Sequence, residues 1–314
     1  RMKRFIIFFV IISIGILMFN FLSPNTKSDS IEDIIYQREF NNKYGIFSIV
    51  KPESISFAGE NAPLFSDDIW ERYDKEILKN VYWQSNTMLY LKRANKFFPI
   101  IEPILKQNNI PDDFKYLALI ESGLENVVSP AGAAGFWQFM KGTAKDYGME
   151  VNSEVDERYN LEISTLAACQ YLQKSYNKFG NWTMAAASYN VGINGLSNRS
   201  KTQKSNNYYD LYLPNETSRY VFRILVVKEI LENPTKYGFI FREKDLYNYP
   251  KTIKMELNKL NVNLPEYALE IGVNYKILKQ YNPWLRSETL INKNGKTYTL
   301  TIPIKEEINI FKTP

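Results

Sequence analysis

Apolar residues recur at helical spacing over most of this 314-residue chain, and the pattern predicts a mainly helical fold. Through residues 67–105 they follow the period of a helix that buries one face against a core. A long apolar helix is predicted from a cap at Asn215 or Thr217 to Leu231, and Asn233-Pro234 ends it. Most of the chain is therefore expected to form packed helices.

The pattern changes character beyond Tyr247. Residues 252–257 and 297–302 alternate between apolar and polar like strands, whereas 265–271 and 275–281 have the pattern of two short helices. The chain is thus expected to end in one small α+β unit with the order β-α-α-β.

Two polar stretches are predicted to lack regular structure. Residues 25–65 carry scattered aromatics and prolines and are typical of a tether. Residues 197–207 are polar and low in complexity, which indicates either a mobile loop beside a binding groove or a simple surface excursion.

The N-terminus predicts a membrane-associated segment. Residues 1–4 are basic, and residues 5–22 carry no charge, a length near the minimum that spans a bilayer. By the positive-inside rule we expect residues 1–24 to be an uncleaved anchor, with the rest outside the cytoplasm. A cleaved signal segment and a buried core helix are the alternatives.

One charged residue interrupts the helical pattern. In the segment 111–121, the apolar positions Phe114, Leu117 and Ala118 follow the spacing i, i+3, i+4. The i+7 position belongs to Glu121, so its carboxyl group is expected to be partly desolvated, which raises its pKa. A general acid that breaks a glycosidic bond needs this property. The alternative is a helix-end glutamate that pairs with a lysine or with the backbone.

The segments after Glu121 carry further candidate chemistry. Gly123 is expected to close the helix. Residues 129–135 are small and lead into the aromatic and amide side chains of 136–140, which can stack on a sugar and hydrogen-bond it. The alanine-rich helix predicted over 181–192 delivers a tyrosine and an asparagine at its end.

Composition excludes several classes of catalyst. The chain contains no histidine, so Ser-His-Asp and Cys-His nucleophile systems and histidine-bearing zinc sites are ruled out. The single cysteine, Cys169, is expected to be a small buried residue and allows no intrachain disulfide. Acid–base chemistry must then fall mainly to carboxylates, tyrosines or lysines. The net charge of +5 suits anionic cell-wall polymers or a membrane surface, and no nucleic-acid-binding motif is present.

In their order and spacing these motifs resemble the catalytic domain of the lytic murein transglycosylases of glycoside hydrolase family 23, in particular its membrane-bound transglycosylase D group. The resemblance covers roughly residues 66–240. Asn160 and Ser188 depart from the group, which more often has aspartate and alanine there. The matching pieces are Glu121-Ser122, Gly135-Phe136-Trp137-Gln138, and Ala187-Ser188-Tyr189-Asn190 with Gly192 beyond.

The resemblance implies a lysozyme-like helical catalytic domain of the goose-type kind over residues 66–245. It also implies non-hydrolytic cleavage of the β-1,4 bond between N-acetylmuramic acid and N-acetylglucosamine, which leaves 1,6-anhydromuramyl ends. Glu121 would be the catalytic residue, and no metal or organic cofactor is implied. The implied substrate-binding residues are Ser129, Gln138, Phe139, Tyr189, Asn190 and Tyr220.

Residues 246–314 resemble a divergent LysM domain, on the β-α-α-β order and on Asn282-Pro283 after the second helix. Such domains bind chains that contain N-acetylglucosamine. The usual Gly-Asp opening is missing, and a purely structural cap on the catalytic domain is the alternative.

Two other functions are compatible with the sequence. A hydrolytic muramidase would need a second carboxylate, for which the chain offers Glu125, Glu154, Asp156 and Glu216. A catalytically silent peptidoglycan-binding protein would keep the fold alone. Under each of these readings the expected partner is the glycan strand, and the expected location is the cell envelope. The protein would be anchored in the inner membrane facing the periplasm, or periplasmic if the first segment is cleaved.

Overall fold

The computed structural model describes residues 31, 35, 38–39, 46–293 and 295–304. The predicted membrane anchor lies outside these residues. Within them, no helix combines the length and the apolar character that crossing a membrane requires. The chain divides into two compact units, 1–48 and 49–314, and the second contains the strands and helices from Ser56 onward.

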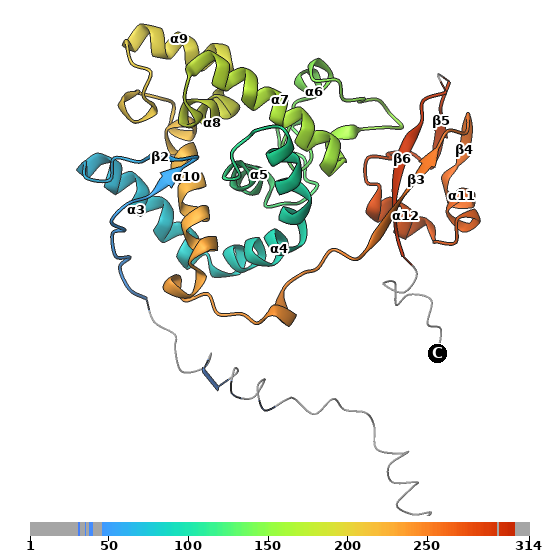
Figure 1. Ribbon diagram of the computed structural model, residues 1–314, viewed down its shortest axis with the longest axis horizontal. Coiled ribbons are helices and arrows are strands. Elements are labelled where there is room, and N and C mark those ends of the chain that lie inside the picture. Colours follow the sequence, from blue (N-terminus) through green and yellow to red (C-terminus); the bar gives the residue numbers. More distant parts are fainter. Residues whose placement is uncertain (1–30, 32–34, 36–37, 40–45, 294, 305–314) are drawn as a thin grey trace, which may run out of the picture. The chain divides into compact units, whose positions relative to one another are not determined.

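The first part of this unit is helical, as the pattern predicts, and α5 lies at its centre with α4 and α10 packed against it (Figure 1). Nearly every position of α5 is buried, from Phe114 to Ser122. The helices are α3 (Asp67–Tyr82), α4 (Gln84–Gln107), α5 (Phe114–Ser122), α6 (Lys141–Asp146), α7 (Leu161–Phe179), α8 (Trp182–Val191), α9 (Ile193–Gln203) and α10 (Asn215–Glu232). Four short 3-10 turns, Glu157–Tyr159, Tyr208–Asp210, Pro234–Tyr237 and Glu243–Asp245, lie among and after them.

The helical character predicted over 67–105 is confirmed, in two helices, because the backbone turns at Trp83 (φ −85°, ψ 58°) between α3 and α4. The expectation for residues 197–207 was wrong. Most of the stretch 197–207, expected as a loop, lies in α9. That helix buries only Leu196 and Ser197, so its sequence carries almost no apolar periodicity to reveal it.

The boundary predicted at residue 65 falls inside the packed unit. A hairpin of β1 (Ser56–Phe57) and β2 (Glu60–Asn61) lies in the stretch expected to be tether. Phe57 is fully buried and its ring meets Phe114 edge to face at 4.9 Å. The Glu60 carboxylate accepts hydrogen bonds from the N–H groups of Trp182 and Thr183 at the start of α8, at 2.6 and 2.9 Å. A few apolar residues in a polar stretch are enough to anchor it here.

The last part has the predicted β-α-α-β order, which is therefore confirmed. Strands β3 (Thr252–Leu257) and β6 (Tyr298–Pro303) pair antiparallel around α11 (Leu264–Glu270) and α12 (Tyr275–Tyr281). A second antiparallel pair, β4 (Asn261–Asn263) with β5 (Thr289–Ile291), was not predicted, because three-residue strands are too short to show alternation.

This C-terminal module shares its hydrophobic core with the helical part. Ala134, Val155 and Tyr159 of the helical part belong to the same buried cluster as the module's Leu285. Backbone hydrogen bonds join the two: Asp156 N–H donates to the Trp284 carbonyl at 2.8 Å, and Arg286 N–H to the Glu154 carbonyl at 2.6 Å. The Lys296 ammonium pairs with Glu150 and with Glu157 at 2.9 Å each.

Candidate functional site

Glu121 lies near the C-terminal end of α5, at the centre of the helical part. The helix stops two residues later because Gly123 adopts a left-handed conformation (φ 63°), as predicted. Ser122 Oγ donates to the Phe136 carbonyl at 2.8 Å and so ties the helix end to the glycine-rich loop, residues 129–139.

The carboxyl group of Glu121 has the character that its place in the sequence predicts. Burial raises its pKa from 4.5 to about 7. The hydroxyl of Tyr220, which donates a hydrogen bond to Glu121, and the charge of Arg223 act in the opposite direction, whereas Glu216 adds to the rise. The hydrogen-bond partner of Glu121 is therefore a tyrosine, and not the lysine of the alternative interpretation. A carboxyl group of this pKa is extensively protonated at neutral pH and can donate that proton.

The glycine-rich loop holds Gln138 in a left-handed conformation (φ 49°) that glycine adopts freely and glutamine does not. Its Nε2 donates to the Val127 carbonyl at 3.0 Å and to the Gly135 carbonyl at 2.8 Å. Ser129 Oγ accepts from Ala133 N–H at 3.0 Å and closes the first turn of the loop. Strained conformations of this kind are found preferentially at functional sites.

Arg158 supports this loop from beneath. Its guanidinium pairs with both oxygens of Asp156 at 2.9 and 2.7 Å, and it donates to the carbonyls of Gly132 at 2.9 Å and Phe139 at 3.1 Å. Arg158 and Asp156 are both buried. Sequence reasoning assigned Arg158 no role, although an arginine two residues after an aspartate is a local signal for such a pair.

Helix α8 delivers Tyr189 and Asn190 to the same region. The Tyr189 hydroxyl donates to the Trp137 carbonyl at 2.7 Å, and its ring packs against Phe139 at 5.9 Å. Burial raises the pKa of Tyr189 well above its ordinary value, so the hydroxyl stays protonated and remains a donor. Asn190 Oδ1 accepts from Thr217 Oγ1 at 2.7 Å, which links α8 to α10.

The predicted binding residues fall into two groups. Those that retain exposed surface, and so remain candidates to touch a substrate, are Ser129, Gln138, Tyr189 and Asn190. Phe139 and Tyr220 are only 3% and 1% exposed. Phe139 packs beneath Tyr189, and Tyr220 acts on Glu121, so both serve the site from within the core.

The four alternative carboxylates differ in their surroundings. Glu125 pairs with Arg93 at 2.8 Å, and Glu154 accepts from Ile291 N–H at 2.6 Å in the C-terminal module. Asp156 is committed to Arg158, as described above. Glu216 alone among the four contributes to the pKa of Glu121, and it is exposed.

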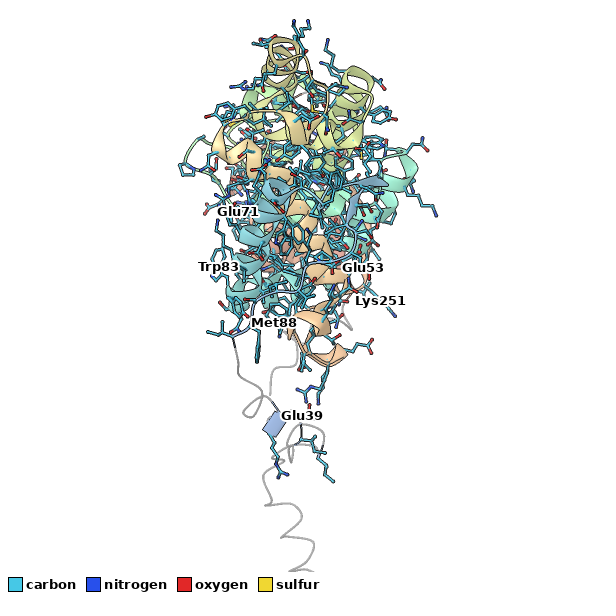
Figure 2. All side chains as sticks on the ribbon, turned by 90° about the vertical axis from the view of Figure 1, so that its left-hand side faces the viewer. Glu39, Glu53, Glu71, Trp83, Met88 and Lys251 are labelled. Atoms are coloured by element: carbon cyan, nitrogen blue, oxygen red, sulfur yellow. The ribbon has the colours of Figure 1, made fainter. Side chains whose placement is uncertain are left out.

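A surface hollow of about 570 Å³ is lined by residues of α3, α4 and α10. Tyr90, one of its lining residues, contacts Gly123, where an added Cβ would lie 3.2 Å from the ring. Trp83, at the turn between α3 and α4, is 62% exposed and projects from the edge of the helical part (Figure 2). The residues that line the hollow also include Tyr82, Arg219 and Arg223. Aromatic faces beside arginines suit sugar rings that carry carboxylates.

Metal ligands do not gather in this region or elsewhere in the described part of the chain. Within that part, no group of three or more histidine, cysteine, aspartate or glutamate side chains could hold a metal ion.

Two family models match parts of the chain. The chain carries a transglycosylase SLT domain, whose family model matches residues 98–212, and a soluble lytic transglycosylase C-terminal LysM-like domain over residues 253–306. It is thus a mainly helical SLT domain followed by a small mixed α/β module, and the resemblance drawn from its motifs is confirmed.

Among characterised proteins, the chain is a distant homologue of the membrane-bound lytic murein transglycosylase D of Escherichia coli. It is 28% identical to the proteins of strains K12 and CFT073 over 241 residues, which are 75% of this chain and 52% of each relative. A putative tributyltin chloride resistance protein of Alteromonas sp. strain M-1 is 27% identical over 117 residues, 37% of this chain and 56% of that protein. The chain spans about half the length of the curated relatives it matches.

Gly135→Ala should destabilise the protein more than Gly132→Ala does. Both glycines have positive φ, so both substitutions carry a backbone strain of about 1–2 kcal/mol. A Cβ at Gly135 would also lie 1.9 Å from the Arg158 carbonyl oxygen, whereas nothing lies within 4 Å of one at Gly132. Overpacking should therefore cost about 1–3 kcal/mol more at Gly135 in urea unfolding. Equal losses would show that the contact with Arg158 is unimportant.

Tyr220→Phe should raise the pKa of Glu121 above about 7, because the hydroxyl that lowers it is removed. If Glu121 must be protonated to act, the alkaline limb of the pH–rate profile should move to higher pH. Tyr209→Phe is the matched control, since the hydroxyl of Tyr209 is also buried but has no hydrogen-bond partner among the described residues. A shift to lower pH, or the same shift in the control, would contradict this assignment.

Proposed function

We propose that this protein is a peptidoglycan lytic transglycosylase that acts in cell-wall remodelling. It would cleave the β-1,4 bond from N-acetylmuramic acid to N-acetylglucosamine without water and leave 1,6-anhydromuramyl ends. The observation that carries the proposal is Glu121, a desolvated carboxyl group with a pKa near 7, held by Tyr220 inside an SLT domain.

In this mechanism one carboxyl group serves twice. Glu121 donates its proton to the glycosidic oxygen as the bond from C1 to that oxygen breaks. The 2-acetamido group of the muramyl residue stabilises C1. The Glu121 carboxylate then takes the proton of the C6 hydroxyl, whose oxygen bonds to C1. Glu121 is protonated again at the end of the cycle, so the reaction consumes no water and needs no second carboxylate.

The surroundings of Glu121 suit both halves of this cycle. Burial favours the neutral acid that the first step needs, and the Tyr220 hydroxyl stabilises the carboxylate that the second step needs. Gln138, Tyr189 and Asn190 would hold the acetamido and sugar groups. Ser129, on the turn that opens the glycine-rich loop, would help place the muramyl residue.

The hydrolytic alternative rests on Glu216. It is the one candidate second carboxylate that contributes to the pKa of Glu121, and Arg219 and Arg223 line a hollow with it. In a hydrolase a second carboxylate would activate water or attack the sugar. Glu216 is the residue to substitute if hydrolytic products are found.

We also propose that the protein works in the cell envelope on glycan strands. The C-terminal LysM-like domain would bind strands that contain N-acetylglucosamine, and residues 1–24 would tether the protein to the inner membrane facing the periplasm. Cleavage of that segment would leave the enzyme periplasmic. The support is the LysM-like match and the homology to a membrane-bound protein.

Glu121→Gln should lower turnover of purified peptidoglycan by about 10²- to 10⁴-fold, because glutamine neither donates nor accepts the reacting proton. Stability gives a second readout. Because the folded pKa is raised, the wild type loses stability as pH rises from 4.5 through about 7, whereas glutamine does not titrate. The melting temperature of the variant should therefore rise relative to that of the wild type between pH 5 and pH 8. Substantial turnover by the folded variant would remove Glu121 from its role.

The products should carry 1,6-anhydromuramyl ends. Each new end is then lighter by one water than a hydrolytic end and is not reduced by borohydride, which mass spectrometry of digested sacculi can detect. Ends that are mainly reducible would indicate a hydrolase, and Glu216→Gln should then abolish activity.

A further inference from the structure

The contact between the C-terminal module and the helical part, here called the seam, consists of residues 150–159 packed against module residues 284–298. Val155 and Leu285 form an antiparallel bridge, flanked by the two backbone hydrogen bonds described above. The guanidinium of Arg286 stacks over the ring of Tyr159, 4.1 Å from its centroid. The seam thus combines strand-like pairing, ion pairs at Lys296 and a shared core.

The seam continues directly into the glycine-rich loop. Ala134, in the middle of that loop, is 1% exposed and belongs to the module's hydrophobic cluster. It also forms bridges with Val128 and Phe139 on either side. The buried cluster that contains the module's core residues therefore extends, through Val155 and Tyr159, to the glycine-rich loop at Ala134.

A second route runs through the buried ion pair. Asp156 donates its N–H to Trp284 of the module and accepts from Arg158 with both carboxylate oxygens. Arg158 in turn donates to the carbonyls of Gly132 and Phe139. A displacement of the module would therefore move the groups that hold the loop at Gly132 and at Phe139.

The loop needs such support because Gln138 is strained. A left-handed glutamine costs about 1–2 kcal/mol, and it persists only where its surroundings determine its conformation. Arg158 supplies part of these surroundings at the carbonyl of Phe139, the residue after Gln138, and Asp156 connects Arg158 to the module.

We infer that the C-terminal module is a positioning element of the active site, which holds the glycine-rich loop and Gln138 in their working conformation through the seam. The inference rests on the proposed function and adds to it. A module that served only to bind distant glycan could be displaced without effect on a short soluble substrate. A module that positions Gln138 could not.

The test opens and closes the seam in the full chain. Lys296→Glu places a third carboxylate beside Glu150 and Glu157 and should open it. Val155 and Leu285 form a non-hydrogen-bonded pair, since the flanking bonds join 156 to 284 and 286 to 154. Cα atoms in such pairs lie about 4.5 Å apart, within the range of a disulfide, so Val155→Cys with Leu285→Cys should lock the seam when oxidised. Cys169 is buried and should not interfere.

The triple variant combines Lys296→Glu, Val155→Cys and Leu285→Cys. Its reduction should lower kcat/KM on a short soluble muropeptide by about 10- to 100-fold relative to the oxidised form. The reason is that small misplacements of substrate-holding groups carry large rate costs. Assays stay well below the melting temperature, and hydrogen exchange of the Asp156 and Arg286 N–H groups reports whether the seam is open. The pH–rate profile should keep its alkaline limb, because Tyr220 and Glu121 lie outside the seam. Lys259→Glu is the control, since its pair with Glu270 lies within the module.

Equal kcat/KM for the oxidised and reduced forms, with exchange showing the seam open on reduction, would overturn the inference. If Lys296→Glu leaves the seam closed, Leu285→Asp is the second variant. Leu285 is fully buried, and a closed seam would bury the unpaired aspartate charge, so this variant should open the seam. A folded Leu285→Asp protein with full activity on the soluble substrate overturns it equally. Inactivity of the unmodified protein would instead count against the proposed function.

Discussion

The buried ion pair between Arg158 and Asp156 is the interaction on which the arrangement around the site depends. Two charges are withdrawn from water there, which is tolerated because the guanidinium also reaches two loop carbonyls and Asp156 also donates its N–H to Trp284. Loss of either partner would leave an uncompensated buried charge, at a cost of about 3–5 kcal/mol. The pair therefore specifies one position for the glycine-rich loop relative to the 3-10 turn Glu157–Tyr159.

The acid–base character of Glu121 results from two opposing effects of the same environment. Removal of the carboxyl group from water raises its pKa, and the Tyr220 hydroxyl and the Arg223 charge limit that rise. Tyr220 and Tyr189 are themselves buried, and desolvation raises the pKa of each well above its ordinary value. Both therefore stay neutral donors at any pH at which Glu121 titrates. The site separates one titrating group from two fixed hydrogen-bond donors.

The helical part brings these groups together by building around α5. The hairpin of β1 and β2 covers one side through Phe57, and Lys228 of α10 pairs with Asp113 just before α5 at 2.6 Å. The same Asp113 accepts from Ala58 N–H of the hairpin at 2.7 Å. Residues that the polar composition places in a tether thus help to fix the start of the helix that carries Glu121.

The sequence by itself determined the features that depend on local pattern. Glu121 at an apolar helical position, Gly123 at the helix end and the β-α-α-β order all follow from spacing and backbone preference, and the structure bears them out. Tertiary structure decided the rest. Helix α9 and the hairpin carry too few apolar residues to show a period, the rings of Phe139 and Tyr220 turn inward, and Arg158 acquires its role from carbonyls 19 and 26 residues away. Local pattern reports what a segment prefers, whereas burial and long-range hydrogen bonds depend on which segments meet.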